Sequence, residues 1–311
     1  MKYRNRSKVN NISYLRKNTR LISSSYIQRE SYFYSKFEST SFERQHGSKF
    51  VHHRQGLLPF DEKSFEALNN ELSNLNITPG GSYTPTECQP KYKIAIIVPY
   101  RNREDNLKLF LKNIHPFLIK QKLEYSIFLI EPIQSIKFNR GLLLNIGFLE
   151  SIQLGQDKWN CFVFHDVDLI PENEKNLYYC PALPKHMSSA VSTFDYRLPY
   201  KGLFGGVSIL KKTHMQRING FSNMYFGWGG EDDDLRKRNN LETGRYRMLK
   251  HKKDSPNPKR FKLLKSSIKR SNIDGLNSIR YVLISVNFEP LFTKIVVSYD
   301  ESLYTRSKAN Y

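Results

Sequence analysis

The apolar run IAIIV at residues 94–98 constrains the fold of this 311-residue chain more than any other stretch. Because the run is short and continuous and ends at a proline, it predicts a strand that is buried on both faces. Apolar residues at helical spacing follow from about residue 104. Further strands are predicted at 125–130 and 161–167, with a helix at 142–154 between them. Strands that alternate with helices predict an α/β fold, with a mostly parallel central sheet flanked by helices.

The segments on either side of this pattern have a different character. Residues 1–55 are rich in Ser, Asn, Arg and Tyr without a lasting period, which predicts a flexible basic tail. A short helix is predicted within 57–75, and the turn-rich stretch 77–88 is expected to be a connection. Towards the C-terminus, further strands are predicted at 204–210 and 281–288.

The charge of the chain indicates either a solvated basic face or an anionic partner. The formal net charge is +20, and residues 245–270 alone hold eleven Lys or Arg against one acid. Such basic blocks are typical of a solvated face, or of a surface that binds phosphate, nucleic acid, membrane lipid or acidic glycan. Since no nucleic-acid recognition motif accompanies the charge, we expect no nucleic-acid partner. No stretch is apolar for long enough to span a bilayer, and the N-terminus lacks the apolar core of a signal peptide.

Polar motifs follow each of the first three predicted strands. They are YRNR at 100–103, FNR at 138–140 and DVD at 166–168. In parallel α/β sheets, ligands bind beyond the carboxyl ends of the strands, so these motifs predict a nucleotide site. Guanidinium forks suit diphosphate oxygens, and three arginines stand where such contacts are needed: Arg101, Arg103 and Arg140. The alternative for each of them is an ordinary surface position.

Two aspartates, Asp166 and Asp168, are two residues apart on the third predicted strand. Their carboxylates are therefore expected to point the same way, while Val167 points back into the core. Two such carboxylates can hold a hard divalent cation, which takes oxygen ligands. The cation can then neutralise a diphosphate leaving group. A pair of aspartates that caps a turn is the alternative.

The stretch FGWGGEDDD at 226–234 combines three glycines, a tryptophan and four consecutive acids. The glycines let the backbone take conformations that other residues avoid, and they let a ligand approach closely. The acids are expected to form the first turn of a helix, where the partial positive charge stabilises carboxylates. Their mutual repulsion predicts that at least one binds its proton more tightly than a free carboxylate does. A solvated acidic run is the alternative, but Trp228 as a stacking surface favours a sugar or nucleotide site.

Together with LFGGVS, INGF and RMLKH, these motifs occur in an order that resembles the β-1,4-galactosyltransferases. The resemblance runs from about Leu57 to the C-terminus. It implies a GT-A-like fold, dependence on Mn²⁺, and transfer of a sugar from a UDP-sugar donor to an N-acetylglucosamine-terminated glycan in the Golgi lumen. It also implies a membrane anchor, which is not visible in this chain. We divide the catalytic domain into an N-terminal half, 56–181, that binds the UDP-sugar, and a C-terminal half, 182–311, with the acceptor and metal sites.

The resemblance also implies roles for individual residues. The manganese ligands it implies are Asp168, Met248 and His251. The catalytic residues it implies are Asp232, as the base, and Glu231. The donor contacts it implies are Pro99, Tyr100, Arg101, Asn102, Arg103, Phe138, Asn139, Arg140, Asp166, Val167, Asp168, Leu203, Trp228 and His251. The acceptor contacts it implies are Tyr200, Gly230, Glu231, Asp232, Asp233, Arg260 and Phe261. Cys161 and Cys180 match a disulfide pair of the family, which implies an oxidising compartment.

An inverting mechanism follows from the resemblance. Asp232 takes the proton of the acceptor 4-hydroxyl as that oxygen attacks the anomeric carbon in line, and Trp228 closes over the bound donor. Leu203 stands where relatives specific for galactose carry a tyrosine, so the transferred sugar is expected to be N-acetylgalactosamine and/or galactose. The alternative is a catalytically impaired relative that binds UDP-sugar or acidic glycan, because the connection from Asp234 to Met248 is shorter than in the family.

Overall fold

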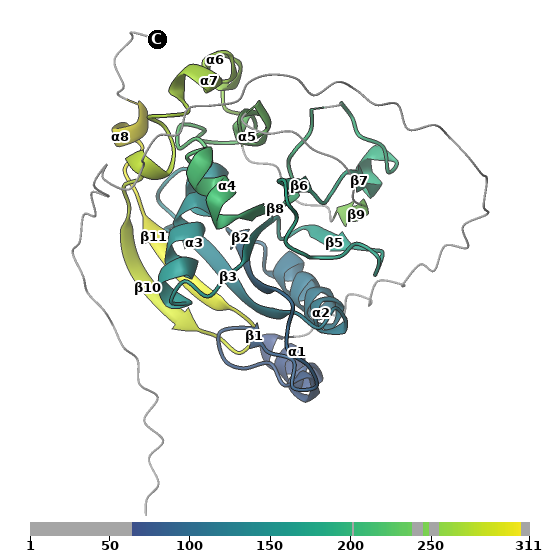
Figure 1. Cartoon of the computed structure of the whole chain (residues 1–311). Helices are drawn as coiled ribbons and strands as arrows, with labels where there is room; N and C mark the ends of the chain where they lie inside the picture. The colour runs from purple at the N-terminus through teal and green to yellow at the C-terminus, as the bar shows by residue number, and fades with distance from the viewer. Residues whose placement is uncertain (1–63, 201, 238–244, 249–254, 306–311) are drawn as a thin grey trace, which may run out of the picture.

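The computed structural model describes residues 64–200, 202–237, 245–248 and 255–305 (Figure 1). The predicted tail at 1–55 and the implied metal ligand His251 lie outside the described residues. Within the described part of the chain, no helix combines the length and the apolar character that crossing a bilayer requires.

A mixed sheet forms the centre of the fold, with the strand order β10-β11-β3-β2-β4-β8-β6 and with β1 paired to β3. Its middle strands β11, β3, β2 and β4 run parallel to one another. The pairs β10–β11, β4–β8, β6–β8 and β1–β3 are antiparallel. A smaller sheet has the order β5-β9-β7. The strands are β1 (Ser82–Tyr83), β2 (Lys93–Pro99), β3 (Glu124–Pro132), β4 (Cys161–His165), β5 (Leu169–Pro171), β6 (Lys185–His186), β7 (Ala190–Val191), β8 (Val207–Lys211), β9 (Arg245–Met248), β10 (Val282–Phe288) and β11 (Thr293–Ser298).

Helices cover both faces of this sheet. They are α1 (Phe65–Glu71), α2 (Glu104–Lys120), α3 (Arg140–Leu154), α4 (Lys212–Arg217), α5 (Glu231–Lys237), α6 (Arg260–Lys265), α7 (Ser267–Arg270) and α8 (Ser302–Thr305), with 3₁₀ turns at Ser73–Leu75, Ser192–Phe194 and Leu276–Ser278. The side chains of Ile94, Ile96 and Val98 belong to the core cluster that contains the apolar face of α2. Those of Ala95 and Ile97 belong to the cluster that contains α3. Strand β2 is therefore buried on both faces, as its apolar run predicts.

The predicted α/β fold is confirmed, with small shifts at the ends of its elements. The strands predicted at 94–98, 125–130 and 281–288 are β2, β3 and β10, and the helix predicted at 142–154 is α3. The helix predicted within 57–75 is shorter, because α1 is followed directly by a 3₁₀ turn, and residues 57–63 lie outside the described residues. The strand predicted at 204–210 begins only at Val207, since Gly206 has a φ of +84°, which breaks the extended backbone.

The strand predicted at 161–167 was placed wrongly at its end, because β4 stops at His165. Asp166 and Asp168 lie in the turn that joins β4 to β5, so strand alternation does not orient their carboxylates. This turn is closed by a hydrogen bond from the backbone N–H of Leu169 to the carbonyl of Asp166 (3.2 Å). The chain then leaves the main sheet, and β5 pairs with β9. Val167 is buried in the core, as predicted.

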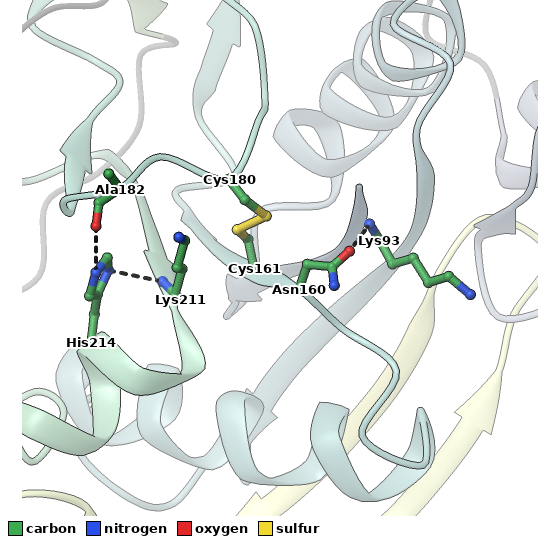
Figure 2. Close-up of a disulfide and its surroundings, with 7 residues drawn as sticks. All are labelled: Lys93, Asn160, Cys161, Cys180, Ala182, Lys211 and His214. Carbon is green, nitrogen blue, oxygen red and sulfur yellow. Dashed lines mark hydrogen bonds between the residues drawn. A yellow bond between two sulfur atoms is a disulfide. The ribbon is translucent and has the colours of Figure 1, made fainter. Parts of the chain in front are cut away.

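The disulfide implied between Cys161 and Cys180 is present (Figure 2). It links the first residue of β4 to the segment that precedes β6. Beside it, the side-chain carbonyl of Asn160 accepts a hydrogen bond from the backbone N–H of Lys93 (2.8 Å), which joins the starts of β4 and β2. Among the described residues, Cys88 is a free thiol.

Candidate active site

Arg140 connects three segments that are far apart in the sequence. Its Nε donates to Oδ1 of Asp166 (2.7 Å), and its Nη2 donates to the carbonyl of Gly206 (3.2 Å). Its Nη1 lies 3.6 Å from Oε1 of Glu231. Burial works against the charge of Arg140, but the two carboxylates outweigh it and raise the pKa of the guanidinium. The DVD turn, the start of β8 and the acidic helix α5 therefore meet at one cation.

The FNR motif is held in place by its own backbone and by the asparagine at its centre. Oδ1 of Asn139 accepts the backbone N–H of Leu142 (2.9 Å), which caps the N-terminus of α3. The carbonyl of Phe138 accepts the N–H of Gly227 (2.9 Å). Since Arg140 is the first residue of the capped helix, the cap fixes the guanidinium relative to the glycine-rich loop.

The acids of the FGWGGEDDD stretch form the first turn of α5, as predicted. Glu231 and Asp234 are buried, whereas Asp232 and Asp233 are partly exposed. Oδ1 of Asp232 accepts the backbone N–H of Asp233 (2.9 Å). A Cβ added to Gly205 would lie 2.3 Å from Oδ2 of Asp232, so this carboxylate contacts the backbone of the FGG segment.

Two of these acids bind protons more tightly than free carboxylates, as predicted, but burial contributes more to this than the repulsion between the acids. Burial, together with the charge of Asp232, raises the pKa of Glu231 to about 8, although Arg140 pulls it down. Burial, together with the charge of Asp233, also raises the pKa of Asp232, and Arg140 again opposes the shift. Arg140 thus favours the ionised form of the acid that faces the FGG segment.

The FGG segment is held by two residues that the sequence analysis missed. Nε2 of His186 donates to the carbonyl of Gly205 (2.8 Å), and the hydroxyl of Ser188 donates to the same carbonyl (2.9 Å). The Ser188 hydroxyl also accepts the N–H of Val207 (2.8 Å). Burial lowers the pKa of His186 to about 4, so its ring is neutral at pH 7 and keeps this donor role. Neither residue belongs to a recognisable motif, and only the β6–β8 pairing brings them here.

The YRNR motif divides into residues that face the DVD turn and residues that do not. Nη1 of Arg103 lies 3.7 Å from Oδ2 of Asp168, whose side chain is buried. Arg101 instead donates to the carbonyl of Ile136 (2.7 Å), and its guanidinium lies 5.4 Å from the centre of the Phe138 ring.

The remaining residues of that strand end are also engaged locally. The side-chain amides of Asn102 and Gln134 exchange two hydrogen bonds of 2.9 Å. Pro99 ends β2, and Tyr100 is buried just beyond it. The structure thus brings Arg103, Arg140 and the two aspartates together, and directs Arg101 towards Phe138.

The arrangement around Asp168 suits a hard cation. Its buried carboxylate offers oxygen ligands, and Asp166 is two residues away in the same turn. In the pairing of β5 with β9, Leu169 is opposite Met248, so the backbone of Met248 lies next to the residue that follows Asp168. No group of three His, Cys, Asp or Glu side chains placed to hold a metal occurs within the described ranges. The implied manganese ligands include a methionine, and His251 lies outside those ranges, so such a group is not expected there.

Aromatic side chains and Arg260 lie at the glycine-rich loop that precedes the acidic run. Trp228 is half exposed, and its backbone N–H donates to the carbonyl of Ser255 (2.9 Å). The guanidinium of Arg260 lies 5.3 Å from the centre of the Trp228 ring and 4.8 Å from that of the exposed Phe261. The backbone of Gly227, with a φ of +84°, passes so close to Ser255 that an added Cβ would lie 2.5 Å from its carbonyl oxygen.

Two implied acceptor and donor residues lie on the segment before the FGG motif. The hydroxyl of Tyr200 donates to Oδ1 of Asp233 (2.8 Å). Leu203 is partly buried, and its N–H donates to the carbonyl of Tyr200 (3.2 Å). A third implied acceptor residue, Gly230, belongs to the glycine-rich loop before α5 and has a φ of +104°. A Cβ added there would lie 2.7 Å from the Tyr225 ring.

Comparison with known proteins gives consistent matches. The sequence models of the N-terminal region of glycosyl transferase group 7 and of the N-terminal domain of galactosyltransferase match residues 50–181 and 185–262. Human β-1,4-galactosyltransferase 2 is 44% identical over 240 residues, which are 73% of this chain and 64% of that protein. Human β-1,4-galactosyltransferase 4 is 45% identical over 232 residues, which are 70% of this chain and 67% of that protein.

Solved structures agree with the sequence matches. The catalytic domain of Drosophila β-1,4-galactosyltransferase 7 in complex with xylobiose is 26% identical, with a TM-score of 0.57, and covers 67% of this chain and 94% of that domain. A mutant of the same enzyme in complex with manganese, UDP-Gal and xylobiose has the same identity and TM-score. The GT-A-like fold implied by the motifs is therefore confirmed. By its family matches and its relatives, the chain belongs to the β-1,4-galactosyltransferases of glycosyl transferase group 7.

Proposed function

We propose that this chain is an inverting, manganese-dependent β-1,4-glycosyltransferase. It moves galactose or N-acetylgalactosamine from the UDP-sugar to a terminal N-acetylglucosamine of a glycan. The observation that carries the proposal is that Arg140 contacts Asp166, Gly206 and Glu231 at once. The carboxylate of Asp232 packs on the neighbouring Gly205. A cation-binding turn and a candidate base thus share one edge of the sheet, where α/β folds bind their ligands.

Asp232 is the proposed general base. As the acceptor 4-hydroxyl attacks the anomeric carbon, its proton moves to the Asp232 carboxylate, the new C–O bond forms, and the bond to the UDP oxygen breaks. Attack on the face opposite the leaving group converts the α-linked donor into a β-linked product. Arg140 supports this role because its charge favours the ionised form of Asp232. Glu231 lies beside the base and is proposed to contact the acceptor.

Asp168, Met248 and His251 are the proposed manganese ligands. When bound, the metal neutralises the charge that develops on the departing diphosphate. Support comes from the buried Asp168 carboxylate, from the strand register that pairs Met248 with Leu169, the residue after Asp168, and from the manganese complex of the Drosophila relative. Arg103 and Arg140 are cationic side chains at the same turn, and we assign them to the donor diphosphate.

The remaining contacts follow the family motifs. On the donor side we propose Pro99, Tyr100, Arg101, Asn102, Phe138, Asn139, Val167, Leu203 and Trp228. On the acceptor side we propose Tyr200, Gly230, Asp233, Arg260 and Phe261. The exposed ring of Trp228 supports stacking on a sugar, since it lies at the same end of α5 as the acids. Trp228 would also exclude water from the donor when it closes over it.

Leu203 supports a donor pocket with room for an N-acetyl group. It lacks the ring and the hydroxyl of a tyrosine, and it lies just before the FGG segment that Asp232 contacts. We expect UDP-GalNAc to be used at least as well as UDP-Gal, with a shift of roughly 10- to 200-fold towards UDP-Gal in Leu203→Tyr. Comparing kcat/KM for both donors tests this. A wild type strongly selective for UDP-Gal, with no shift in the variant, would contradict it.

The compartment that suits this chemistry is the Golgi lumen. The Cys161–Cys180 disulfide supports an oxidising environment. UDP-sugar and glycan are the proposed partners, and nucleic acid is not expected.

A coupled assay of UDP release tests the proposed function. Purified protein is incubated with UDP-Gal or UDP-GalNAc, N-acetylglucosamine and Mn²⁺, with and without chelator. Release that requires both acceptor and metal is expected, together with a β-1,4-linked disaccharide identified by NMR. Donor binding without any release would instead identify the chain as a catalytically impaired relative.

A further inference from the structure

A buried ion network surrounds Asp234, the last acid in the first turn of α5. Its centre is Arg270, the last residue of α7, which is 2% exposed. Nη2 of Arg270 donates to Oδ2 of Asp234 (3.1 Å), and Nη1 pairs with the carboxylate of Asp274. The hydroxyl of Tyr225 donates to the same oxygen of Asp234 (2.9 Å). The last acid of the run is therefore neutralised by a cation from a different helix.

This network continues to the helix that carries Arg140. The carboxylate of Asp274 accepts hydrogen bonds from the Ser222 hydroxyl and from the N–H of Asn223 (2.8 Å for the second). Asn223 in turn accepts from the side-chain amides of Asn145 (2.9 Å) and Asn139 (2.8 Å). Both of these asparagines belong to the start of α3 or its first turns. Buried polar contacts thus lead from Arg270 through Asp274 and Asn223 to Asn139, the residue that caps α3 just before Arg140.

The first turn of α5 is consequently fixed at both ends. Arg140 holds Glu231 at the start, and Arg270 holds Asp234 three residues later. Asp232 lies between these two contacts and faces Gly205. We propose that Arg270 is a positioning residue for the reaction, which orients Asp232 through Asp234 and cancels the charge of Asp234 so that Asp232 stays ionised. This inference rests on the proposed role of Asp232 as the base.

The effect of the Arg270 charge on the pKa of Asp232 can be measured, because the groups that face Asp232 are known. Asp232 is faced by the carboxyl groups of Asp233 and Glu231 and by the hydroxyl of Tyr200. Arg140 is the cation that favours the ionised form of Asp232. Asp234 is faced by Tyr225 and Arg270, and Arg270 is also faced by Asp274. If Arg270 loses its charge, Asp234 becomes an uncompensated anion in the same helical turn as Asp232, which then binds its proton more tightly.

The expected size of the effect follows from Coulomb's law. One charge at roughly 10 Å in an effective dielectric constant of about 20 shifts a pKa by roughly one unit. Arg270→Gln should raise the pKa of Asp232 by that amount, and Asp234→Asn should lower it. The double variant Arg270→Gln with Asp234→Asn removes both charges and should return close to the wild-type value. Arg270→Lys keeps the charge and should leave the pKa nearly unchanged.

Carboxyl ¹³C NMR titration of the full chain, labelled at aspartate, tests the charge effect without any need for activity. The Asp232 signal is assigned by its absence in Asp232→Asn. In parallel, the acid limb of kcat against pH should move with the Asp232 pKa, and Arg270→Lys should show a lower kcat with little change in the KM for the donor.

A matched control separates this effect from loss of stability. Lys112 of α2 is another buried cation, paired with Glu71 of α1 at 3.1 Å, and these two helices lie at the other end of the molecule from α5 and α7 (Figure 1). Lys112→Gln should reduce the melting temperature but leave the Asp232 titration in place. If Arg270→Gln does not fold, the downward shift in Asp234→Asn still decides the matter. An Asp232 pKa that is the same in every folded variant as in the wild type would overturn the proposal. An inactive wild type whose variants show the predicted pKa shifts would overturn only the proposed reaction.

Discussion

Replacing Gly205 by alanine should separate catalysis from folding. The backbone φ of Gly205 is not in the left-handed region, so the substitution introduces no backbone strain. The added Cβ, however, would lie 2.3 Å from Oδ2 of Asp232. That is about 1 Å short of the 3.4 Å at which ordinary van der Waals contact begins. The atom that must yield is the end of the Asp232 side chain, which can rotate away while the backbone stays in place.

The consequence for the reaction should be large. A displacement of about 1 Å of a reacting group can cost on the order of 10²-fold in rate. We therefore expect kcat of Gly205→Ala to fall by roughly 100-fold. The melting temperature and the affinity for the UDP-sugar should stay close to those of the wild type, because no buried backbone group has to move.

A double-mutant cycle with Asp232→Asn makes the reasoning testable. Loss of the general base by itself should reduce kcat by on the order of 10²–10⁴-fold with donor binding retained. In that background, Gly205→Ala should have little further effect, since the base it displaces is already gone. Steady-state kinetics and calorimetric donor binding give the needed values. Near-full turnover in Gly205→Ala, or an equal loss with and without the Asp232 carboxylate, would refute the contact as the cause.

Three further predictions concern the metal, the acidic turn and the disulfide. His251→Ala should raise the Mn²⁺ concentration needed for half-maximal activity more than Met248→Ala does, because imidazole suits this metal better than thioether; equal requirements in the wild type and His251→Ala would contradict the ligand set. Because burial raises the folded-state pKa of Glu231 to about 8 from an ordinary 4.5, its stabilising contribution should be complete below about pH 4.5 and be lost as the pH rises towards 8. Urea unfolding should give a lower free energy of unfolding at pH 8 than at pH 5, and the difference between the two values should be smaller in Glu231→Gln. Replacing both Cys161 and Cys180 by serine should lower the free energy of unfolding by roughly 3 kcal/mol, which chemical denaturation measures.

Local sequence patterns determined most of the secondary structure and the identity of the motifs. The run at 94–98 predicts a doubly buried strand because a strand between two helical layers has no polar face. The four acids at 231–234 predict a helix start because carboxylates are stabilised there. Both signals depend on neighbouring residues only, so they can be read without the fold. The ordered motifs likewise identified the family from the sequence alone.

Other features depend on contacts between distant residues, and only the tertiary structure decided them. The strand predicted at 161–167 ends at His165, before Asp166, because the turn that follows and the pairing of β5 with β9 outweigh the local strand pattern. His186 was missed because nothing near it in the sequence indicates that it donates to Gly205. Arg270 and Asp234 are 36 residues apart, and their pairing requires both helices to be docked.

The tertiary structure also decided which of the four acids binds its proton most tightly. Sequence alone predicts repulsion among four adjacent acids, but it does not say which of them keeps its proton. That depends on how deeply each carboxylate is buried and on which cation reaches it. Arg140 reaches Glu231 and Arg270 reaches Asp234, whereas Asp232 faces Gly205 and has the charge of Asp233 next to it. Coulomb energies fall with distance through space, and distance through space is set by the packing of α3, α5 and α7, not by their order in the chain.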